Sequence, residues 1–369
     1  MTIATSEHVE PRRPHAEPAP VDPAKLQGFL GQVVSDFGAI VGAAAAAIGD
    51  ELGLYKAMAD GEPLTPAGLA ERTGTDERYV REWLLNQAAG GYVAYDTATA
   101  TYALPPEQAL ALTNEDSPAY VAGGFKLLLA AAKAAPRVAQ AFHTSGGLSW
   151  DTHDPDLFDG TERFFRPSYV ANLVSSWIPA LDGIVARLET GATVADVGCG
   201  HGETTILMAQ AYPRSRFFGF DTHTRSIERA RRAAAEAGVA DRVVFEVAEA
   251  TAFPGSAYDL VAYFDAFHDL GDPLTAARHA YERLAADGTL LLVEPAAGET
   301  IEDNLNPLGR LFAGGSLLIC VPHALATGQS ALGNQATEGQ LREVLSAAGF
   351  SRLRRAAETP FNRVFEVRR

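Results

Sequence analysis

The chain has 369 residues, of which 47% are hydrophobic and 21% are charged, and its formal net charge is −16. This length is sufficient for two domains with hydrophobic cores, and the acidic balance argues against binding to the phosphate backbone of nucleic acids. With only Cys199 and Cys320 the chain cannot build a disulfide framework, and it has no C-x-x-C spacing for zinc.

The N-terminal part of the chain divides into a polar arm and an apolar segment. Residues 1–23 are rich in proline and lack an apolar run, which predicts a disordered arm and not a secretory signal. Residues 24–57 are alanine-rich and helical in character, with too few charges to stand alone in water, so we expect a second subunit to cover them. The longest apolar run, residues 38–49, is too short to span a bilayer. We therefore expect a cytoplasmic protein.

A small module with two helices and a hairpin follows. Thr65 and Pro66 predict the start of a short helix, Gly74 ends it, and Thr75 is expected to cap a second helix. Two short runs within residues 92–104 predict a two-stranded hairpin. This order of two helices followed by a hairpin is typical of a winged helix. We therefore expect residues 24–110 to form a mostly α-helical winged-helix domain.

The pattern of apolar residues changes near residue 191. Residues 111–190 are broken helical stretches with several aromatic residues, which we expect to form a helical linker and a lid. From 191 to 369, short apolar runs alternate with segments of helical period. This alternation predicts a mostly parallel sheet with helices on both faces, closed by a terminal antiparallel hairpin.

A glycine-rich loop follows the first strand of that sheet, in the sequence DVGCGHGETT at residues 196–205. Its glycines follow G-x-G-x-G, whereas a dinucleotide site requires G-x-G-x-x-G. The third glycine of the dinucleotide pattern is replaced by Glu203, which would repel a pyrophosphate at the start of the helix. Asp221 ends the second strand, at the offset where an acid accepts hydrogen bonds from ribose hydroxyls.

The DVGCGHG motif, Asp221 and the strand order together resemble the class I S-adenosylmethionine-dependent methyltransferases. The order of the whole chain from about residue 30 is similar to methyltransferases with an N-terminal winged-helix dimerisation domain, including small-molecule O-methyltransferases. The resemblance implies a Rossmann-like seven-stranded α/β sheet, S-adenosyl-L-methionine as cofactor, and a homodimer joined through the N-terminal domain. It also implies in-line methyl transfer to a small, aromatic or hydroxylated molecule.

The resemblance implies two sets of binding residues. The cofactor is expected to contact the glycine loop, the ends of the next strands and two lid residues near its carboxylate: Asp196, Gly198, Cys199, Gly200, Gly202, Asp221, Thr222, Glu249, Ala250, Phe264, Asp265, Arg166 and Tyr169. The acceptor is expected to lie against apolar side chains of the lid and of the segment after the fifth strand: Trp150, Phe164, Phe165, Leu308 and Phe312.

The family places a His-Asp-aromatic-x-Asp motif after the fourth strand, and its histidine is the catalytic base. Here the motif is matched from His268 to Asp272, with Leu270 in the aromatic position. Two family acids flank the histidine, and the matching positions are Glu294 and Gln335. The glutamine departs from the pattern because it cannot stabilise an imidazolium by charge. An imidazole with an ordinary pKa of about 6.5 is mostly unprotonated at neutral pH and can accept a proton.

The histidines also allow other roles. His268 could instead form part of the pocket wall. No metal is expected, because His201, His223 and His279 fall at no recognised ligand spacing. His143 and His153 lie in the broken helical stretch and are expected at the surface or in the lid.

An alternative function is a winged-helix transcriptional regulator with a ligand-sensing methyltransferase-like domain. Residues 61–105 contain three arginines (72, 78 and 81) and six acids (62, 71, 76, 77, 82 and 96), a net charge of 3 − 6 = −3. Because phosphate neutralisation supplies most non-specific DNA affinity, this module is poorly suited to DNA. The sequence favours an O-methyltransferase without a nucleic-acid partner, and it does not identify the acceptor.

Overall fold

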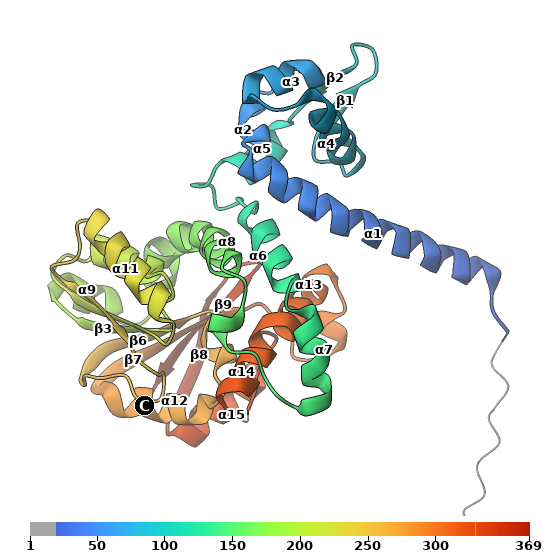
Figure 1. Ribbon diagram of the computed structural model, residues 1–369. Helices are drawn as coiled ribbons and strands as arrows, with labels where there is room; N and C mark the ends of the chain where they lie inside the picture. Colours follow the sequence, from blue (N-terminus) through green and yellow to red (C-terminus); the bar gives the residue numbers. More distant parts are fainter. Residues whose placement is uncertain (1–19, 329) are drawn as a thin grey trace, which may run out of the picture.

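The computed structural model describes residues 20–328 and 330–369. Most of the arm predicted at residues 1–23 therefore lies outside the described residues. The described chain consists of a long N-terminal helix, a small helical domain and a larger α/β domain (Figure 1).

The first helix extends away from the rest of the molecule in Figure 1. Helix α1 spans Pro23–Glu51, and its N-terminus is capped by the Asp22 side chain, which accepts from the backbone of Ala24 and Lys25. Gly53 adopts a left-handed conformation and separates α1 from the short helix α2, Leu54–Ala57. The segment predicted as one helix at 24–57 is therefore broken in two.

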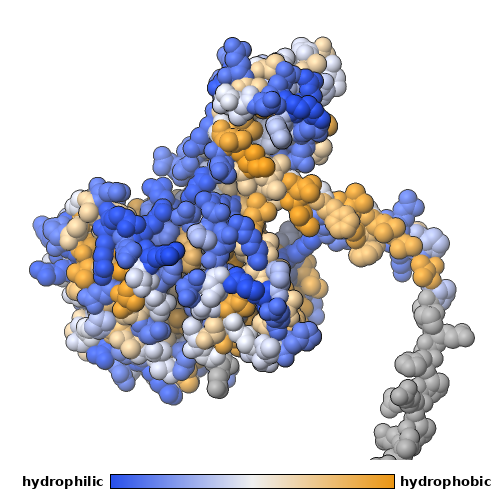
Figure 2. All heavy atoms as spheres, viewed as in Figure 1, coloured by the Kyte–Doolittle hydropathy of each residue, from blue (hydrophilic) through white to orange (hydrophobic). Residues whose placement is uncertain are grey.

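Within residues 20–328 and 330–369, two helices are long and apolar enough, by length and composition, to cross a membrane. One is α1, with a mean hydropathy of 1.5 and only 6% of its most apolar window buried; the other is Pro307–Thr327, of which 44% is buried. The second is accounted for as a partly buried helix of the α/β domain, whereas α1 exposes its apolar side chains along its length (Figure 2).

The small domain has the predicted order of helix, turn, helix and hairpin. Its elements are α3 (Pro66–Thr73), α4 (Glu77–Ala89), β1 (Ala94–Asp96), β2 (Thr101–Ala103) and α5 (Pro106–Thr113). Thr65 caps α3 through its hydroxyl, as expected, but Asp76 and not Thr75 caps α4. The carboxylate of Asp76 accepts from two backbone N–H groups at 2.9 and 3.3 Å. Leu69, Val80 and Leu84 supply the centre of the domain's hydrophobic core.

A set of helices connects this domain to the sheet. They are α6 (Gly123–Ala132), α7 (Ala135–Thr144), η1 (Trp150–Thr152), α8 (Asp156–Asn172), η2 (Leu173–Trp177) and α9 (Ile184–Thr190). Glycines allow α6 and α8 to approach closely: a Cβ atom at Gly160 would lie 2.4 Å from the Leu127 backbone nitrogen. Arg163 of α8 forms an ion pair with Asp50 of α1 at 2.6 Å, which ties the N-terminal helix to the lid.

The large domain contains a seven-stranded sheet with the order β5-β4-β3-β6-β7-β9-β8. Its strands are β3 (Thr193–Val197), β4 (Arg216–Asp221), β5 (Val243–Val247), β6 (Tyr258–Phe264), β7 (Leu284–Pro295), β8 (Arg352–Glu358) and β9 (Asn362–Arg368). The first five are parallel, and β9 is antiparallel to both β7 and β8. The predicted parallel sheet with a terminal antiparallel hairpin is confirmed.

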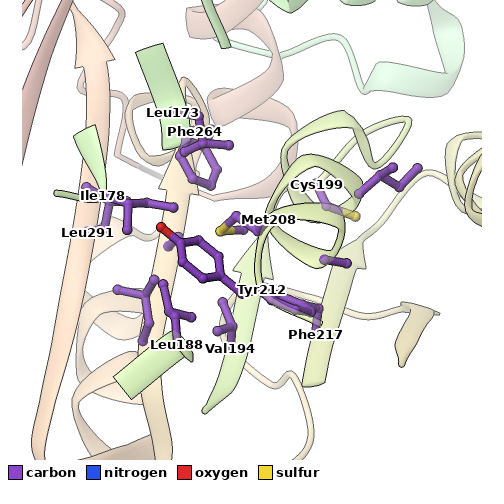
Figure 3. Packing of buried hydrophobic residues seen from close by; sticks show 14 of the residues in the cluster. Leu173, Ile178, Leu188, Val194, Cys199, Met208, Tyr212, Phe217, Phe264 and Leu291 are labelled. Atoms are coloured by element: carbon purple, nitrogen blue, oxygen red, sulfur yellow. The ribbon is translucent and has the colours of Figure 1, made fainter. Parts of the chain in front are cut away.

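Helices cover both faces of the sheet. They are α10 (Glu203–Ala211), α11 (Thr224–Glu236), η3 (Phe267–Asp269), α12 (Pro273–Arg283), η4 (Glu302–Asn304), α13 (Pro307–Gly315), η5 (Ser316–Cys320), α14 (Val321–Thr327) and α15 (Glu338–Ala348). On one face, Met208, Tyr212 and Phe217 pack with side chains of η2, α9 and β7 (Figure 3). On the other face, α12 and α15 bury a second cluster around Tyr263 and Phe365. These two clusters fix the strands whose carboxyl ends carry the candidate site.

Candidate active site

A cavity of about 370 Å³ lies at the carboxyl edge of the parallel strands. Its walls come from the glycine loop, the ends of β4 and β6, the lid helix α8 and the helical segment from α13 to α14. This volume is within the range of small-molecule sites, roughly 300–1,000 Å³. Ligands of open α/β sheets bind at this edge, so the cavity is the candidate active site.

The glycine loop is held in place by the end of the neighbouring strand. The backbone N–H groups of Gly198 and Cys199 donate to the carbonyl of Phe220 at 2.7 and 3.0 Å. The Asp221 carboxylate accepts from the Gly200 N–H at 2.9 Å and from the His223 N–H at 2.8 Å. Asp221 therefore shapes the loop as well as facing the cavity.

Two glycines of the loop are required by close packing. A Cβ atom at Gly198 would lie 2.6 Å from the Ala266 side chain, and one at Gly202 would lie 2.5 Å from the Phe245 ring. Both residues also have positive φ angles, which favour glycine. At Gly200, by contrast, a Cβ would meet no described atom within 4 Å, so this position leaves space on the cavity side.

Two predicted cofactor contacts lie beneath the loop and do not line the cavity. Asp196 is fully buried, and its Oδ2 accepts from the hydroxyls of Thr204 and Thr205, both at 2.6 Å. Burial raises the pKa of Asp196 to about 6. Gly202 packs against Phe245 as described above. Asp196 supports the loop through its hydrogen bonds to Thr204 and Thr205, and Gly202 supports it by packing against Phe245.

The other predicted cofactor residues are brought to the cavity wall. They are Gly198, Cys199, Gly200, Asp221, Thr222, Glu249, Ala250, Phe264, Asp265, Arg166 and Tyr169. Carboxylates at Asp221 and Glu249 can accept from ribose hydroxyls and from an adenine amino group, and Gly200 leaves the backbone accessible. The donor and acceptor set therefore fits an adenosine-containing ligand.

The lid helix α8 contacts the rim of this region through side chains. Arg166 pairs with Glu203 at 3.0 Å, and the Tyr169 hydroxyl donates to Asp265 at 2.8 Å. Arg166 and Tyr169 are the two residues predicted to reach a cofactor carboxylate, and Glu203 and Asp265 are their partners in this structure. His201 Nδ1 lies 2.8 Å from Glu162 of α8, a contact that sequence reasoning missed because the two residues are 39 positions apart.

Asp265 follows β6 in a strained backbone conformation and lines the cavity. Its φ is +50°, a value that non-glycine residues rarely adopt. The carboxylate accepts from Tyr169 and from the Asn362 side-chain amide, each at 2.8 Å. Burial raises the pKa of Asp265 to about 7, since the hydrogen bond from Tyr169 only partly offsets the loss of hydration. The bonds from Tyr169 and Asn362 fix the orientation of the carboxylate.

His268 lies in η3, directly after β6, and faces the same cavity. Its Nδ1 is 2.8 Å from Oε2 of Glu294, which lies at the end of the adjacent strand β7. Both side chains are buried, with 3% and 1% of their surface exposed. The structure thus brings together the predicted base and one of its two expected partners. The hydrogen bond to Glu294 occupies Nδ1 and leaves Nε2 for other partners.

The charge around His268 alters its expected titration. Burial lowers the pKa of the imidazole, but the carboxylates of Asp269 and Glu294 outweigh this and raise it well above the ordinary value. His268 Nε2 is 3.3 Å from Asp269 Oδ1. The imidazole is therefore harder to deprotonate than the sequence alone suggested.

Gln335, the second expected partner of His268, was a wrong prediction. Its amide donates to Asn304 at 3.3 Å, and the residue does not line the cavity. The preceding residue, Asn334, does line it, and its buried Oδ1 has no hydrogen-bond partner in the described structure. The turn at Gly333, which donates to the His268 carbonyl at 3.3 Å, places the amide of residue 334 inward. A one-residue offset in a loop leaves no signal in the sequence.

The predicted acceptor wall is largely present. Trp150, Phe164, Phe165 and Phe312 line the cavity, whereas Leu308 does not. Leu308 lies one turn before Leu311 and Phe312 on α13, and the later turn is the one that faces inward. His153 is buried beside Trp150 and not at the surface, and burial lowers its pKa to about 4.

Sequence reasoning missed Cys320 and His323, which also line the cavity. They lie in adjoining helical elements, η5 and α14, at positions i and i+3. Their spacing was a usable signal, since residues three apart on a helix share one face.

Two families of known proteins match separate stretches of this chain. Residues 41–114 match the family described as the Rv2258c-like winged HTH domain. Residues 188–348 match the family described as a methyltransferase domain.

Two curated relatives each match less than half of this chain. A 27-O-demethylrifamycin SV methyltransferase of Amycolatopsis mediterranei is 33% identical over 169 residues, which cover 44% of this chain and 57% of the relative. A trans-aconitate 2-methyltransferase of Streptomyces coelicolor is 32% identical over 103 residues, which cover 28% and 34% respectively. The chain thus matches little more than half the length of the first relative and a third of the second.

Solved structures match over nearly the whole chain. The mitomycin 7-O-methyltransferase has a TM-score of 0.68 at 20% identity and covers 94% of this chain and 100% of its own. Human N-acetylserotonin methyltransferase, solved with S-adenosylmethionine, has a TM-score of 0.67 at 17% identity and covers 95% and 99%. At these identities the likeness shows a shared fold.

Proposed function

We propose that this chain, which belongs to the S-adenosylmethionine-dependent methyltransferases and carries an N-terminal winged helix-turn-helix domain, methylates an oxygen atom of a small, aromatic or hydroxylated molecule. The observation that carries the proposal is the His268–Glu294 pair, which faces the same cavity as the glycine loop. A general base beside a cofactor site is what transfer to a hydroxyl group requires. The names of the mitomycin and rifamycin relatives, both O-methyltransferases, support this choice of atom.

S-Adenosylmethionine, when bound, supplies an electrophilic methyl group. The residues that would hold it are the glycine loop, Asp221 at the ribose and Glu249 at the adenine. Trp150, Phe164 and Phe312 would hold the acceptor by apolar contact and exclude water from the reacting oxygen. Holding both partners in line supplies a large part of the acceleration.

His268 would accept the proton of the acceptor hydroxyl on Nε2. Glu294 holds Nδ1 and stabilises the imidazolium that forms, so that the pair acts as base and orienting group. Phenols, catechols and quinols, tested with labelled cofactor, are the first acceptors to screen. Incorporation of label into none of them, or into nitrogen or carbon acceptors alone, would contradict the proposed reaction.

The pH profile of the reaction gives one test. A base works only when it is unprotonated, so kcat/KM should be low in acid and should rise as pH passes the raised pKa of His268. We therefore expect the midpoint of the acid limb above the ordinary imidazole value of about 6.5. Asp269→Asn should move the midpoint to lower pH, because it removes a negative charge that raises this pKa. The control is Asp241→Asn, an exposed aspartate. A midpoint unchanged by Asp269→Asn would contradict this account.

We further propose that α1 joins two copies of the chain. Phe29, Phe37 and Ile40 are 61–65% exposed along this helix, which is too apolar a surface for solvent (Figure 2). The double variant Phe37→Glu/Ile40→Glu of the full chain should therefore be monomeric by light scattering, while the wild type is dimeric. Phe142→Glu, at an exposed phenylalanine on α7, is the matched control and should leave the dimer intact. A dimer that survives the double variant would refute this arrangement.

A DNA-binding regulator is the second candidate, since the N-terminal family is a winged helix-turn-helix. The helix that would enter the groove, α4, is capped by Asp76 and begins with Glu77. Both arginines of this helix, Arg78 and Arg81, are paired with glutamates of the same helix. This charge distribution favours a structural role for the domain. A salt-sensitive, sequence-specific shift of a DNA probe by the intact protein would favour the regulator instead.

A further inference from the structure

The candidate base is one of three side chains that could together bind a metal ion. His268, Asp269 and Cys320 each offer one atom, and these atoms all lie within 4.8 Å of one another. His268 and Cys320 are buried, Asp269 is half-buried, and all three line the cavity. The group joins η3 after β6 to the end of η5, so it depends on the fold and not on sequence proximity.

The geometry around His268 is that of a metal-ligating imidazole. Its Nδ1 is occupied by Glu294, which leaves Nε2 directed at the other two residues. A carboxylate on the remote nitrogen is the usual support of a histidine ligand. The Nε2 to Asp269 Oδ1 distance is 3.3 Å. Ligands about 2.0–2.1 Å from a tetrahedral zinc ion are separated by roughly the same distance.

A second observation points to the same place. His323 lies one helical turn after Cys320, is 91% buried (9% exposed) and lines the same cavity. Its Nδ1 has no hydrogen-bond partner within the part of the chain that the structure describes. A buried polar atom without a partner is costly, and a metal ion in this cavity would supply one.

We propose that Zn²⁺ binds His268 Nε2, Asp269 and Cys320, with its fourth position open to the cavity or to His323. A thiolate, an imidazole and a carboxylate together select zinc over magnesium or calcium, which require oxygen ligands alone. A cysteine binds zinc as the thiolate, so binding at Cys320 releases the proton of its thiol.

The consequence for catalysis is inhibition, and this part rests on the proposed function. The lone pair of Nε2 that would accept the acceptor's proton is instead donated to zinc. Zinc would also occupy the space beside the base. Methyl transfer should therefore be reversibly blocked by zinc and restored by a chelator.

The second group of possible ligands in the described chain does not support the same inference. Asp159, Glu162 and His201 also lie within 4.8 Å of one another. Arg229, however, pairs with Asp159 at 2.9 Å and with Glu162 at 2.7 Å. A guanidinium already neutralises this group, and a divalent cation would have to displace it.

Cobalt(II) tests the binding site directly, because its absorption reports both thiolate ligation and geometry. The full-length protein, stripped with a chelator and titrated with Co²⁺, should develop a sulfur-to-cobalt charge-transfer band and intense tetrahedral ligand-field bands. Zinc should abolish both by displacement. Cys320→Ser should remove the charge-transfer band, and Cys199→Ser, at the other buried cysteine, should keep it. Absence of the band in the wild type, or its persistence in Cys320→Ser, overturns the proposal.

Two further variants separate a ligand site from a folding effect. Asp269→Asn should weaken Co²⁺ binding while a charge-transfer band remains at saturation, and Glu294→Gln should weaken it by about 10- to 100-fold. In the activity assay, with each protein compared with its own zinc-free rate, Cys320→Ser should require at least tenfold more Zn²⁺ than wild type for half-inhibition. Equal inhibition of wild type and Cys320→Ser would contradict the inhibitory site. Cobalt bands without any methyl transfer would leave the metal site standing and refute the proposed function.

Discussion

Replacing His268 with alanine is expected to lower turnover on a neutral hydroxyl acceptor by about 10²- to 10⁴-fold, the usual contribution of a positioned general base. A phenol with a pKa near 10 is only about 0.1% ionised at neutral pH, so the uncatalysed loss of its proton is limiting. The side chain lies 2.8 Å from Glu294 and faces the cavity, where an acceptor hydroxyl can reach Nε2. Turnover should be measured at saturating cofactor.

Three variants separate basicity from shape at this position. His268→Asn should fail to a similar extent, because an amide fills the space without accepting the proton. Glu294→Gln should cost less than His268→Ala, because it orients and charges the base but does not take the proton. His143→Ala, at an exposed histidine on α7, is the control and should have no effect. Full turnover of His268→Ala would reduce His268 to part of the pocket wall.

Cofactor affinity distinguishes a lost base from a damaged site. The glycine loop is anchored to β4 by Gly198, Cys199 and Asp221, and none of these contacts passes through His268. Binding of S-adenosylmethionine to His268→Ala should therefore be nearly unchanged. A parallel loss of cofactor affinity would indicate that the substitution disturbs the cavity as a whole.

The sheet and the glycine loop were predictable because their signals are local. Alternating apolar runs define the strands, and a strand followed by glycines defines the loop, so Asp221 and His268 could both be placed at the carboxyl edge. Glu294 followed from the same logic, since β6 and β7 are adjacent parallel strands. Residues at the ends of neighbouring parallel strands meet at one edge whatever the loops do.

The positions of the remaining site residues depend on loop conformation and on which turn of a helix borders the cavity. Gln335 and Leu308 were each named on the correct segment, but the turn at Gly333 places Asn334 inward, and the cavity meets α13 one turn after Leu308, at Leu311 and Phe312. No local pattern determines which turn of a helix borders the cavity. Contacts such as His201 with Glu162 need the tertiary packing of α8, which the sequence does not specify.

Replacing Asp221 with alanine is expected to weaken S-adenosylmethionine binding by roughly 10- to 150-fold, measured by calorimetry. A hydrogen bond from a ribose hydroxyl to a charged acceptor contributes about 1.5–3 kcal/mol, which corresponds to that range. The structure adds a second reason, because the same carboxylate accepts from the Gly200 and His223 backbone at 2.9 and 2.8 Å. Loss of both contacts would free the loop that faces the cofactor.

Two comparisons make the Asp221 result specific. Asp221→Asn keeps one acceptor oxygen and should lose less affinity than the alanine variant, whereas Asp241→Ala, at an aspartate with 75% of its side chain exposed, should lose none. A nicotinamide dinucleotide should bind neither wild type nor variants, because Glu203 stands where a pyrophosphate would meet the start of α10. Its carboxylate is already paired with Arg166 at 3.0 Å, so this lid contact also competes with a phosphate for the arginine. Unchanged cofactor affinity in Asp221→Ala would overturn the assignment of the ribose site to the end of β4.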